Sequence, residues 1–191
     1  MLKKMAAWLA TSQGLSAEDE EVLLYSLTIL TTTLGNILGL ALLAWLLDTG
    51  WETMAVTLPA VTLRMWAGGG HATAPWRCVM VGTTVMALLA WLTRTASYWL
   101  EPVVPVLVIL AALITWRYAP APAPNKPLSS RQQADKLRRR ALITLTFWAI
   151  IIFLFWLLAV PAWLTAGMAL GLFWQGLTVV PPVYHWLGKY F

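Results

Sequence analysis

Residues 141–160 read ALITLTFWAIIIFLFWLLAV and contain no charged side chain. A helix needs about 20 predominantly apolar residues to cross the hydrocarbon core of a bilayer, and this stretch has that length. It therefore predicts a transmembrane helix and, with it, an integral membrane protein.

The composition of the whole chain agrees with a membrane environment. Of the 191 residues, 60% are hydrophobic and only 11% are charged, whereas about 25% of the residues of an ordinary soluble domain are charged. A soluble fold of this size needs more polar side chains to cover its surface. The 13 tryptophans also suit a membrane interface, because an indole combines an apolar body with one N–H donor. The composition therefore argues against a water-soluble domain.

Five long apolar segments and one short segment follow one another along the chain. The long segments are 22–47, 79–93, 98–116, 141–160 and 162–180. The short segment, 51–63, reaches only about 20 Å, so we expect it to dip into the membrane, to tilt, or to be extended through Thr49 or Arg64. We therefore predict a single all-α membrane domain over residues 1–191, with about six transmembrane helices of which the second is short or re-entrant.

The N-terminal stretch, residues 1–15, is predicted to form an amphipathic helix that lies in the membrane interface. Four apolar side chains fall at helical spacing with two lysines beside them: Leu2, Met5, Trp8, Leu9, Lys3 and Lys4. The chain turns polar at Thr11 before a long apolar core develops, which argues against a signal peptide. The acidic cluster at 18–21 then predicts the start of the next helix, because carboxylates are favourable at a helix N-terminus.

The longest polar stretch, residues 117–140, is predicted to be a cytoplasmic loop with a Pro-rich part and a basic part. Its Ala-Pro run at 119–124 is expected to be extended, and the basic part that follows is expected to be helical. Seven of the 13 basic residues lie here: Arg117, Lys126, Arg131, Lys136, Arg138, Arg139 and Arg140. Positive charge beside transmembrane segments is typical of a cytoplasmic loop, whereas a nucleic-acid surface needs a folded polar domain. We therefore expect no nucleic-acid partner.

Alternation of the crossings fixes the rest of the topology once this loop is placed in the cytoplasm. Both termini and the segment 64–78 then lie on the cytoplasmic side, whereas Asp48 and Glu52 lie outside. Arg94 is an exception, because its positive charge falls on the outer side.

Two of the predicted crossings carry glycines four residues apart, Gly35 with Gly39 and Gly167 with Gly171. This spacing lets two helix backbones approach closely in lipid. The sequence leaves two interpretations open, a homodimer that associates through these faces and packing within one subunit.

The segment 64–78 gathers the residue types that thiol chemistry needs. It holds the only cysteine, Cys78, one of the two histidines, His71, and three consecutive glycines, 68–70. A cysteine peptidase uses a thiol nucleophile, an imidazole that takes its proton, and backbone N–H groups that approach the developing oxyanion. A single cysteine also excludes an intrachain disulfide and a multi-cysteine metal site. We expect neither a metal nor another cofactor.

The spacing of His71 and Cys78 limits how the two side chains can meet. On one unbroken helix they would lie about 10.5 Å apart, too far for direct proton transfer. We therefore expect His71 in a loop that folds back, and Cys78 in the first turns of the next helix, with Thr73 as N-cap and Pro75 in the first turn. The helix N-terminus, Arg77 and a protonated His71 would each favour the thiolate.

Other interpretations of these residues stay open at this point. A lone cysteine in a membrane protein is often an inert apolar residue, a lone histidine often simply interfacial, and a glycine run often a simple turn. A second class of function is a small transporter, in which the glycines and the short segment 51–63 would form a broken helix at a substrate site. A third is a scaffold protein without chemistry at Cys78.

At these residues the sequence resembles the accessory gene regulator B (AgrB) family, membrane endopeptidases that process the quorum-sensing pro-peptide AgrD in Gram-positive bacteria. The resemblance rests first on the spacing of Arg64, Gly69, His71 and Cys78. It rests second on the stretches 117–121 (Arg-Tyr-Ala-Pro-Ala) and 125–128 (Asn-Lys-Pro-Leu), and it extends to Gln175-Gly176-Leu177. The chain departs from the family at Pro122-Ala123-Pro124 and at Ala72.

The resemblance implies a bacterial cell-membrane location, an AgrD-like pro-peptide as partner and roles for several residues. Cys78 would attack a peptide bond of the pro-peptide and form a thioester, with His71 as general base and then general acid. A thiol or hydroxyl of the same peptide would then close a thiolactone or lactone ring.

The supporting residues take further roles under the same resemblance. Arg64 would orient the substrate or a carbonyl of the site, and Gly69 would permit close backbone approach. The basic residues Arg138, Arg139 and Arg140 are a hypothetical docking surface for an acidic tail of the peptide. No third catalytic residue is visible in the sequence, so a Cys–His dyad is the default.

Overall fold

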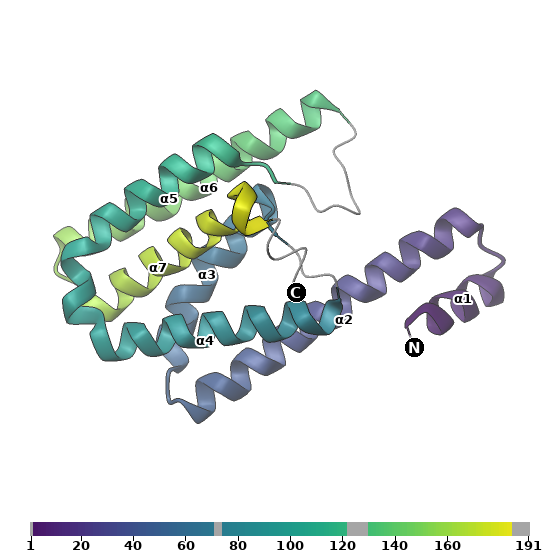
Figure 1. Cartoon of the computed structure of the whole chain (residues 1–191), viewed down its shortest axis with the longest axis horizontal. Helices are drawn as coiled ribbons and strands as arrows, with labels where there is room; N and C mark the ends of the chain where they lie inside the picture. Colours follow the sequence, from purple (N-terminus) through teal and green to yellow (C-terminus); the bar gives the residue numbers. More distant parts are fainter. Residues whose placement is uncertain (1, 71–73, 122–129, 185–191) are drawn as a thin grey trace.

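The computed structural model describes residues 2–70, 74–121 and 130–184, and within them the chain is built from helices alone (Figure 1). The helices are α1 (Leu2–Gln13), α2 (Ala17–Leu46), α3 (Gly50–Ala67), α4 (Pro75–Leu100), α5 (Val104–Tyr118), α6 (Arg131–Leu157) and α7 (Ala162–Thr178), with the short 3-10 helix η1 (Glu101–Val103) between α4 and α5. The predicted all-α fold is confirmed.

The helix α7 lies at the centre of the bundle, where it contacts α3, α4, α5 and α6 (Figure 1). Its small residues let it approach α3 closely. A Cβ atom added at Gly171 would lie 2.0 Å from the carbonyl oxygen of Val56, and one added at Gly167 would lie 3.0 Å from the Cβ of Ala55. The glycine pair on α7 therefore packs α7 against α3.

The other glycine pair also packs helices within the chain. A Cβ atom added at Gly35 would lie 3.1 Å from a methyl carbon of Val79, and one added at Gly39 would lie 2.8 Å from the methyl carbon of Thr83. These contacts join α2 to α4. Both pairs thus serve packing within one subunit, and neither is left free to form the homodimer face that the sequence allowed.

The second segment is extended through Arg64, which is one of the outcomes that the sequence left open. It is not among the candidate membrane spans of the described residues, so whether it crosses fully stays a prediction. Helix α3 runs unbroken through its internal Pro59 to Ala67, which gives it 18 residues and a length of about 27 Å. Its polar side chains lower the hydropathy of the segment, and some of them have hydrogen-bond partners inside the bundle. Thr62, for example, accepts a hydrogen bond of 2.8 Å from the indole N–H of Trp148 on α6.

The continuity of α3 bears on the transporter interpretation as well. That interpretation expected the glycines and segment 51–63 to form one broken helix. In the structure the glycines follow the end of α3, because Gly68 is its C-cap residue, and they lead toward the start of α4. The described residues therefore lack the broken helix on which the transporter interpretation rested.

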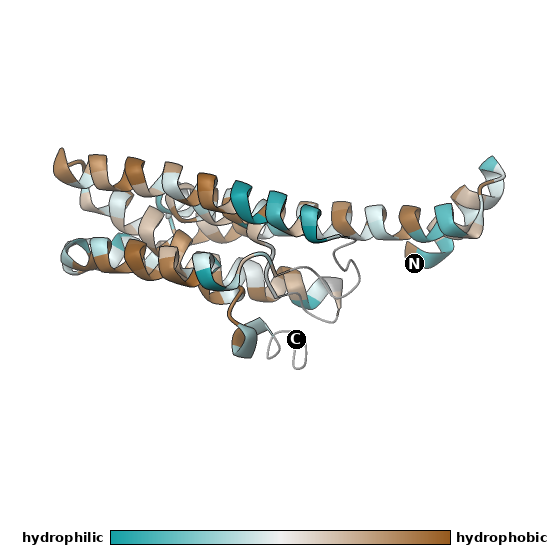
Figure 2. Cartoon of the chain, turned by 90° about the horizontal axis from the view of Figure 1, so that it is seen from above, coloured by the Kyte–Doolittle hydropathy of each residue, from teal (hydrophilic) through white to brown (hydrophobic). Residues whose placement is uncertain are grey.

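Within the described residues, three helical segments are long and apolar enough to cross a membrane. They are Ala17–Leu46, Trp76–Tyr118, which holds α4, η1 and α5, and Arg131–Leu157. Large apolar side chains such as Leu38, Ile109 and Ile150 are exposed on the outside of the helices, as expected of side chains that face lipid. Figure 2 shows hydrophobic residues along the outer ribbons. The chain is thus membrane-embedded, and the count of six crossings stays a prediction.

The helix α1 folds back along the first part of α2, and this part of the chain extends away from the rest of the bundle (Figure 1). Ala6 and Ala10 of α1 are buried in this contact. The predicted start of the next helix is confirmed, because α2 begins at Ala17 with a capping box between Ser16 and Asp19. The position of α1 in the membrane interface stays a prediction.

The stretch 117–140 is divided between two helices and a shorter connection. Helix α5 continues to Tyr118, and α6 begins at Arg131 after its N-cap Ser130, whose hydroxyl accepts a hydrogen bond of 3.2 Å from the backbone N–H of Gln133. The expected helical basic part is therefore the start of α6. Residues 122–129, which include the Pro-rich run from Pro122, lie outside the described residues.

Arg94, the basic residue that the predicted topology leaves on the outer side, forms an ion pair there with Asp48. Its guanidinium donates a hydrogen bond of 2.7 Å to the carboxylate of Asp48, and both side chains are substantially exposed. Asp48 precedes α3 and Arg94 lies near the end of α4, so the two residues meet at the end remote from Cys78. The positive charge of Arg94 is thus neutralised where it lies.

Candidate active site

Cys78 lies in the first turn and a half of α4, as the sequence predicted. Pro75 is the first residue of the helix, and the backbone N–H of Cys78 donates to the carbonyl of Ala74 at 3.1 Å. The prediction of Thr73 as N-cap is wrong, because the N-cap is Ala74, which has an extended backbone and no side-chain cap. The Cys78 side chain is half-buried. His71 and Thr73 themselves lie outside the described residues.

Arg64, near the end of α3, contacts the glycine stretch that leads toward α4. Its Nη2 donates a hydrogen bond of 2.8 Å to the carbonyl oxygen of Gly70. Its guanidinium also lies within electrostatic range of Cys78. The structure therefore brings together three parts of the predicted site: Arg64, the glycine stretch and Cys78.

The glycine stretch 68–70 is held by segments far away in the sequence. The backbone N–H of Gly69 donates to the carbonyl of Ala121 at 3.0 Å, and the N–H of Ala121 donates to Ala67 at 2.8 Å. The N–H of Gly70 donates to the carbonyl of Thr178 at 2.9 Å. These contacts tie the stretch to the chain after α5 and to the end of α7. It is a fixed backbone segment and not a free turn.

At two of the three positions, 68 and 69, both the backbone conformation and the lack of space for a side chain require glycine. Gly68 has a φ of 71° and Gly69 a φ of 139°, which side-chain-bearing residues rarely adopt. A Cβ atom at Gly68 would lie 2.0 Å from the Ala121 carbonyl oxygen. At Gly69 it would lie 2.5 Å from the Thr178 hydroxyl and 3.1 Å from Nη1 of Arg64. Gly69 thus provides the room in which Arg64 approaches the glycine backbone.

Gln175 is a contact of this site that sequence reasoning missed. Its side chain on α7 is only 1% exposed, and its Nε2 donates a hydrogen bond of 2.8 Å to the carbonyl of Gly68. In the sequence, Gln175 stands out only as part of the stretch 175–177 that resembles the family. The available signal was an amide in the otherwise apolar run 162–180, because a polar group there needs a partner.

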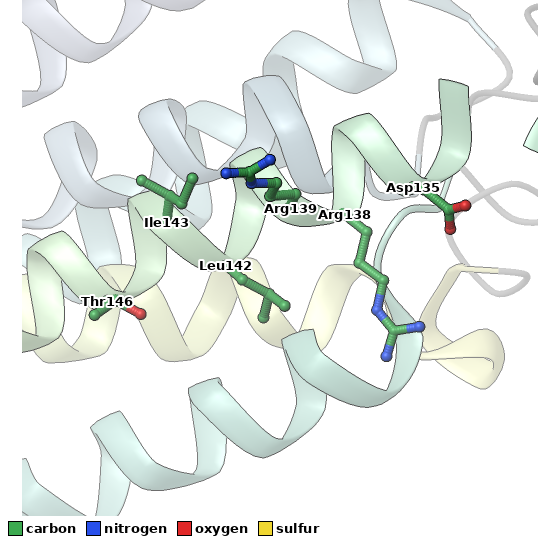
Figure 3. Close-up of a pocket in the computed structure, with 6 residues that line it drawn as sticks. All are labelled: Asp135, Arg138, Arg139, Leu142, Ile143 and Thr146. Atoms are coloured by element: carbon green, nitrogen blue, oxygen red, sulfur yellow. The ribbon is translucent and has the colours of Figure 1, made fainter. Parts of the chain in front are cut away.

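The three arginines of the hypothetical docking surface point in different directions around α6. Arg138 donates a hydrogen bond of 2.8 Å to the carbonyl of Trp116 on α5, and the guanidinium of Arg140 lies 4.7 Å from the ring centre of Trp66 on α3. Arg139 lines an open groove of about 460 Å³ along α6 (Figure 3), together with Asp135, Arg138, Leu142, Ile143 and Thr146. Arg138 and Arg140 are therefore engaged within the chain, and Arg138 and Arg139 both line the groove.

The described part of the chain contains no candidate metal-binding site. There, no three side chains among His, Cys, Asp and Glu lie close enough together to hold an ion. The chemistry open to the described site is that of a thiol, a guanidinium and backbone amides.

The fold and the site define an all-α membrane protein with a candidate thiol site at one end of its bundle. Residues 2–179 match the family described as Accessory gene regulator B. The chain belongs to this family, which acts in the quorum-sensing accessory system and takes part in the processing of AgrD-type peptides.

Curated relatives agree with this assignment. The chain is 24% identical to "Putative AgrB-like protein 2" of Clostridium perfringens (strain 13), over 93% of this chain and 88% of the relative. It is 23% identical to "Putative AgrB-like protein" of Clostridium perfringens (strain SM101), over 85% and 81%. It is 27% identical to protein FsrB of Enterococcus faecalis, over 82% of this chain and 63% of the relative. No solved structure is significantly similar to the chain.

A substitution at Gly68 tests whether the glycine stretch is held as described. Gly68→Ala is expected to lower the free energy of unfolding by about 1–3 kcal/mol more than Gly14→Ala, because overpacking adds to the strain. The control is matched, since Gly14 has a similar φ of 65° but no atom within 4 Å of an added Cβ. Thermal unfolding of the detergent-solubilised variants measures both changes. Equal losses would contradict the contact between Gly68 and Ala121.

Proposed function

We propose that this protein is a membrane cysteine endopeptidase that cleaves an AgrD-type pro-peptide and promotes ring closure of its product. The observation that carries the proposal is the position of the sole cysteine at the start of α4, beside a guanidinium that is itself held by the Gly70 carbonyl. A cation next to the thiol favours the nucleophilic thiolate. Membership of the AgrB family supports the peptide as substrate.

In the proposed first step the thiolate of Cys78 attacks the carbonyl carbon of a peptide bond. The C–S bond forms and the C–N bond breaks, so the acyl part of the peptide becomes a thioester on Cys78. His71 is the proposed general base for the thiol and the general acid that protonates the leaving amine. The C-terminal part of the pro-peptide leaves at this step.

In the proposed second step a side chain of the bound peptide attacks the thioester. A thiol closes a thiolactone ring and a hydroxyl closes a lactone ring, and in both cases the proton passes to the departing Cys78 sulfur. A membrane-embedded site keeps bulk water away, which favours ring closure over hydrolysis. No cofactor is required by either step.

Arg64 has two proposed roles in this mechanism. Its Nη2 fixes the Gly70 carbonyl, and the positive charge of its guanidinium stabilises negative charge that develops near Cys78. Gly69 has a proposed supporting role, because its lack of a side chain leaves room for the guanidinium.

The basic start of α6 is the proposed docking surface for an acidic segment of the peptide. Arg138 lines the groove but also donates to the Trp116 carbonyl, and Arg140 stacks on Trp66, so Arg139 is the arginine that we propose meets the peptide. The groove passes from the charged side chains to Leu142 and Ile143, which suits a ligand with acidic and apolar parts.

The end of the bundle that carries the site is proposed to face the cytoplasm of a bacterial cell, together with both termini. Arg64, Arg77, Arg117 and Arg138 lie near this end, whereas Asp48, Glu52 and Glu101 lie near the opposite end. This distribution follows the excess of positive charge that cytoplasmic ends carry.

Substitution of the nucleophile tests the peptidase proposal. Purified protein in lipid is incubated with a candidate AgrD-type pro-peptide, and the products are analysed by mass spectrometry. Wild type is expected to give a truncated or cyclised peptide and a covalent adduct on Cys78, and Cys78→Ala is expected to give neither. Thermal unfolding of Cys78→Ala controls for folding. Identical products from both proteins would remove the proposal.

Charge reversal at Arg139 tests the docking surface. Arg139→Glu is expected to weaken peptide binding about three- to tenfold at low salt, the equivalent of one or two exposed ion pairs, and less at high salt. Lys3→Glu is the control, because it makes the same charge change at an exposed residue of α1. Binding is measured with a fluorescent peptide and the Cys78→Ala background. Equal affinities of the two variants would contradict docking at Arg139.

Labelling of single cysteines tests the orientation. In a Cys78→Ser background, Leu158→Cys at the end of α6 and Ser130→Cys before its start place a thiol at exposed positions at opposite ends of that helix. A membrane-impermeant maleimide is expected to label Leu158→Cys in intact cells, and Ser130→Cys only after permeabilisation. The reverse pattern would invert the proposed topology.

A further inference from the structure

We propose that Gln175 on α7 is a positioning residue of the thiol site, which aligns Arg64 with Cys78 through the backbone of Gly68–Gly70. The inference deepens the proposed function and rests on it. Gln175 is far from Cys78 in the sequence, and it belongs to a different helix from Arg64 and Cys78.

Gln175 is buried, so its side-chain amide needs a hydrogen-bond partner within the protein. The side chain is 1% exposed, and its Nε2 lies 2.8 Å from the Gly68 carbonyl oxygen. Helix α7 has no charged residue, and Gln175 is its only side-chain amide. A buried amide without a partner is costly, so the Gly68 carbonyl and the Gln175 side chain hold each other in place.

Helix α7 holds the glycine stretch at both ends. Gln175 binds the Gly68 carbonyl, and the carbonyl of Thr178, three residues further along the chain, accepts from the N–H of Gly70. Two contacts about one helical turn apart fix both the position and the direction of the short segment between them.

The fixed segment in turn determines where Arg64 lies. The Gly70 carbonyl accepts from Nη2 of Arg64 at 2.8 Å, and a Cβ atom at Gly69 would come within 3.1 Å of Nη1. A shift of Gly68–Gly70 would therefore move or release the guanidinium. Because the attraction between the guanidinium and a Cys78 thiolate weakens with distance, that shift would lower the reactivity of the thiol.

Alkylation of the only cysteine tests this chain of contacts without any peptide. The full-length protein in lipid nanodiscs is treated with iodoacetamide over a range of pH, and the rate at Cys78 is followed by mass spectrometry. Gln175→Met keeps the length of the side chain but removes the N–H donor. Arg64→Gln removes the guanidinium, and a double variant combines both changes. Thr165→Val is the control, because Thr165 is a buried residue of the same helix that donates to the carbonyl of Ala162, near the opposite end of α7 from Gln175.

Gln175→Met and Arg64→Gln are each expected to slow alkylation about three- to tenfold at neutral pH, the size of effect that one hydrogen bond has. The double variant is expected to react no more slowly than Arg64→Gln alone, because Gln175 acts through Arg64. Thr165→Val is expected to match wild type. If Gln175→Met does not fold, Gln175→Asn tests the same bond, because its amide is one methylene too short to reach the Gly68 carbonyl.

An unchanged rate in the Gln175 variant would overturn the inference, and so would a slowing of equal size in the Arg64→Gln background. Peptide processing is measured in parallel, where the Gln175 variant is expected to lower kcat and leave KM unchanged. Absence of processing by wild type would remove the proposed function, whereas a normal alkylation profile in the variant would remove only the role of Gln175.

Discussion

The close approach of α7 to α3 is the contact on which the rest of the bundle depends. Lipid tails are as apolar as the helix surfaces, so close packing must hold helices together where the hydrophobic effect does not. Gly171 permits this packing because it places the α7 backbone against the Val56 carbonyl. The same contact brings the last turn of α7, with Gln175 and Thr178, to the end of α3.

The candidate site is built from polar groups that satisfy one another in an apolar bundle. Unpaired backbone groups are costly away from water, so the glycine stretch needs partners for its amides and carbonyls. Ala121, Thr178 and Gln175 supply several of them, and Arg64 binds the carbonyl of Gly70. The position of the guanidinium beside Cys78 is therefore a consequence of how α3, α7 and the chain after α5 meet.

Local patterns predicted much of the fold, and they failed where polar side chains lie inside the bundle. The apolar runs, the acidic start of α2 and the place of Cys78 after Pro75 follow from short-range rules of length and capping. The length of α3 does not follow from these rules. Its polar residues suggest that the helix ends early, because the sequence does not show that a residue such as Thr62 has a partner, here Trp148, inside the bundle. The Thr73 cap failed for a similar reason, since the helix begins at Pro75 after Ala74 without a side-chain cap.

The sequence by itself determined that this is an all-α membrane protein of the AgrB family with one cysteine near a helix start, because apolar length, charge placement and motif spacing are properties of the linear chain. Only the tertiary structure decided that both glycine pairs pack within one subunit, that Arg138 and Arg140 are engaged by tryptophans, and that Gln175 binds Gly68. These contacts join residues up to 107 positions apart, and no local pattern specifies which distant backbone group a buried donor will meet.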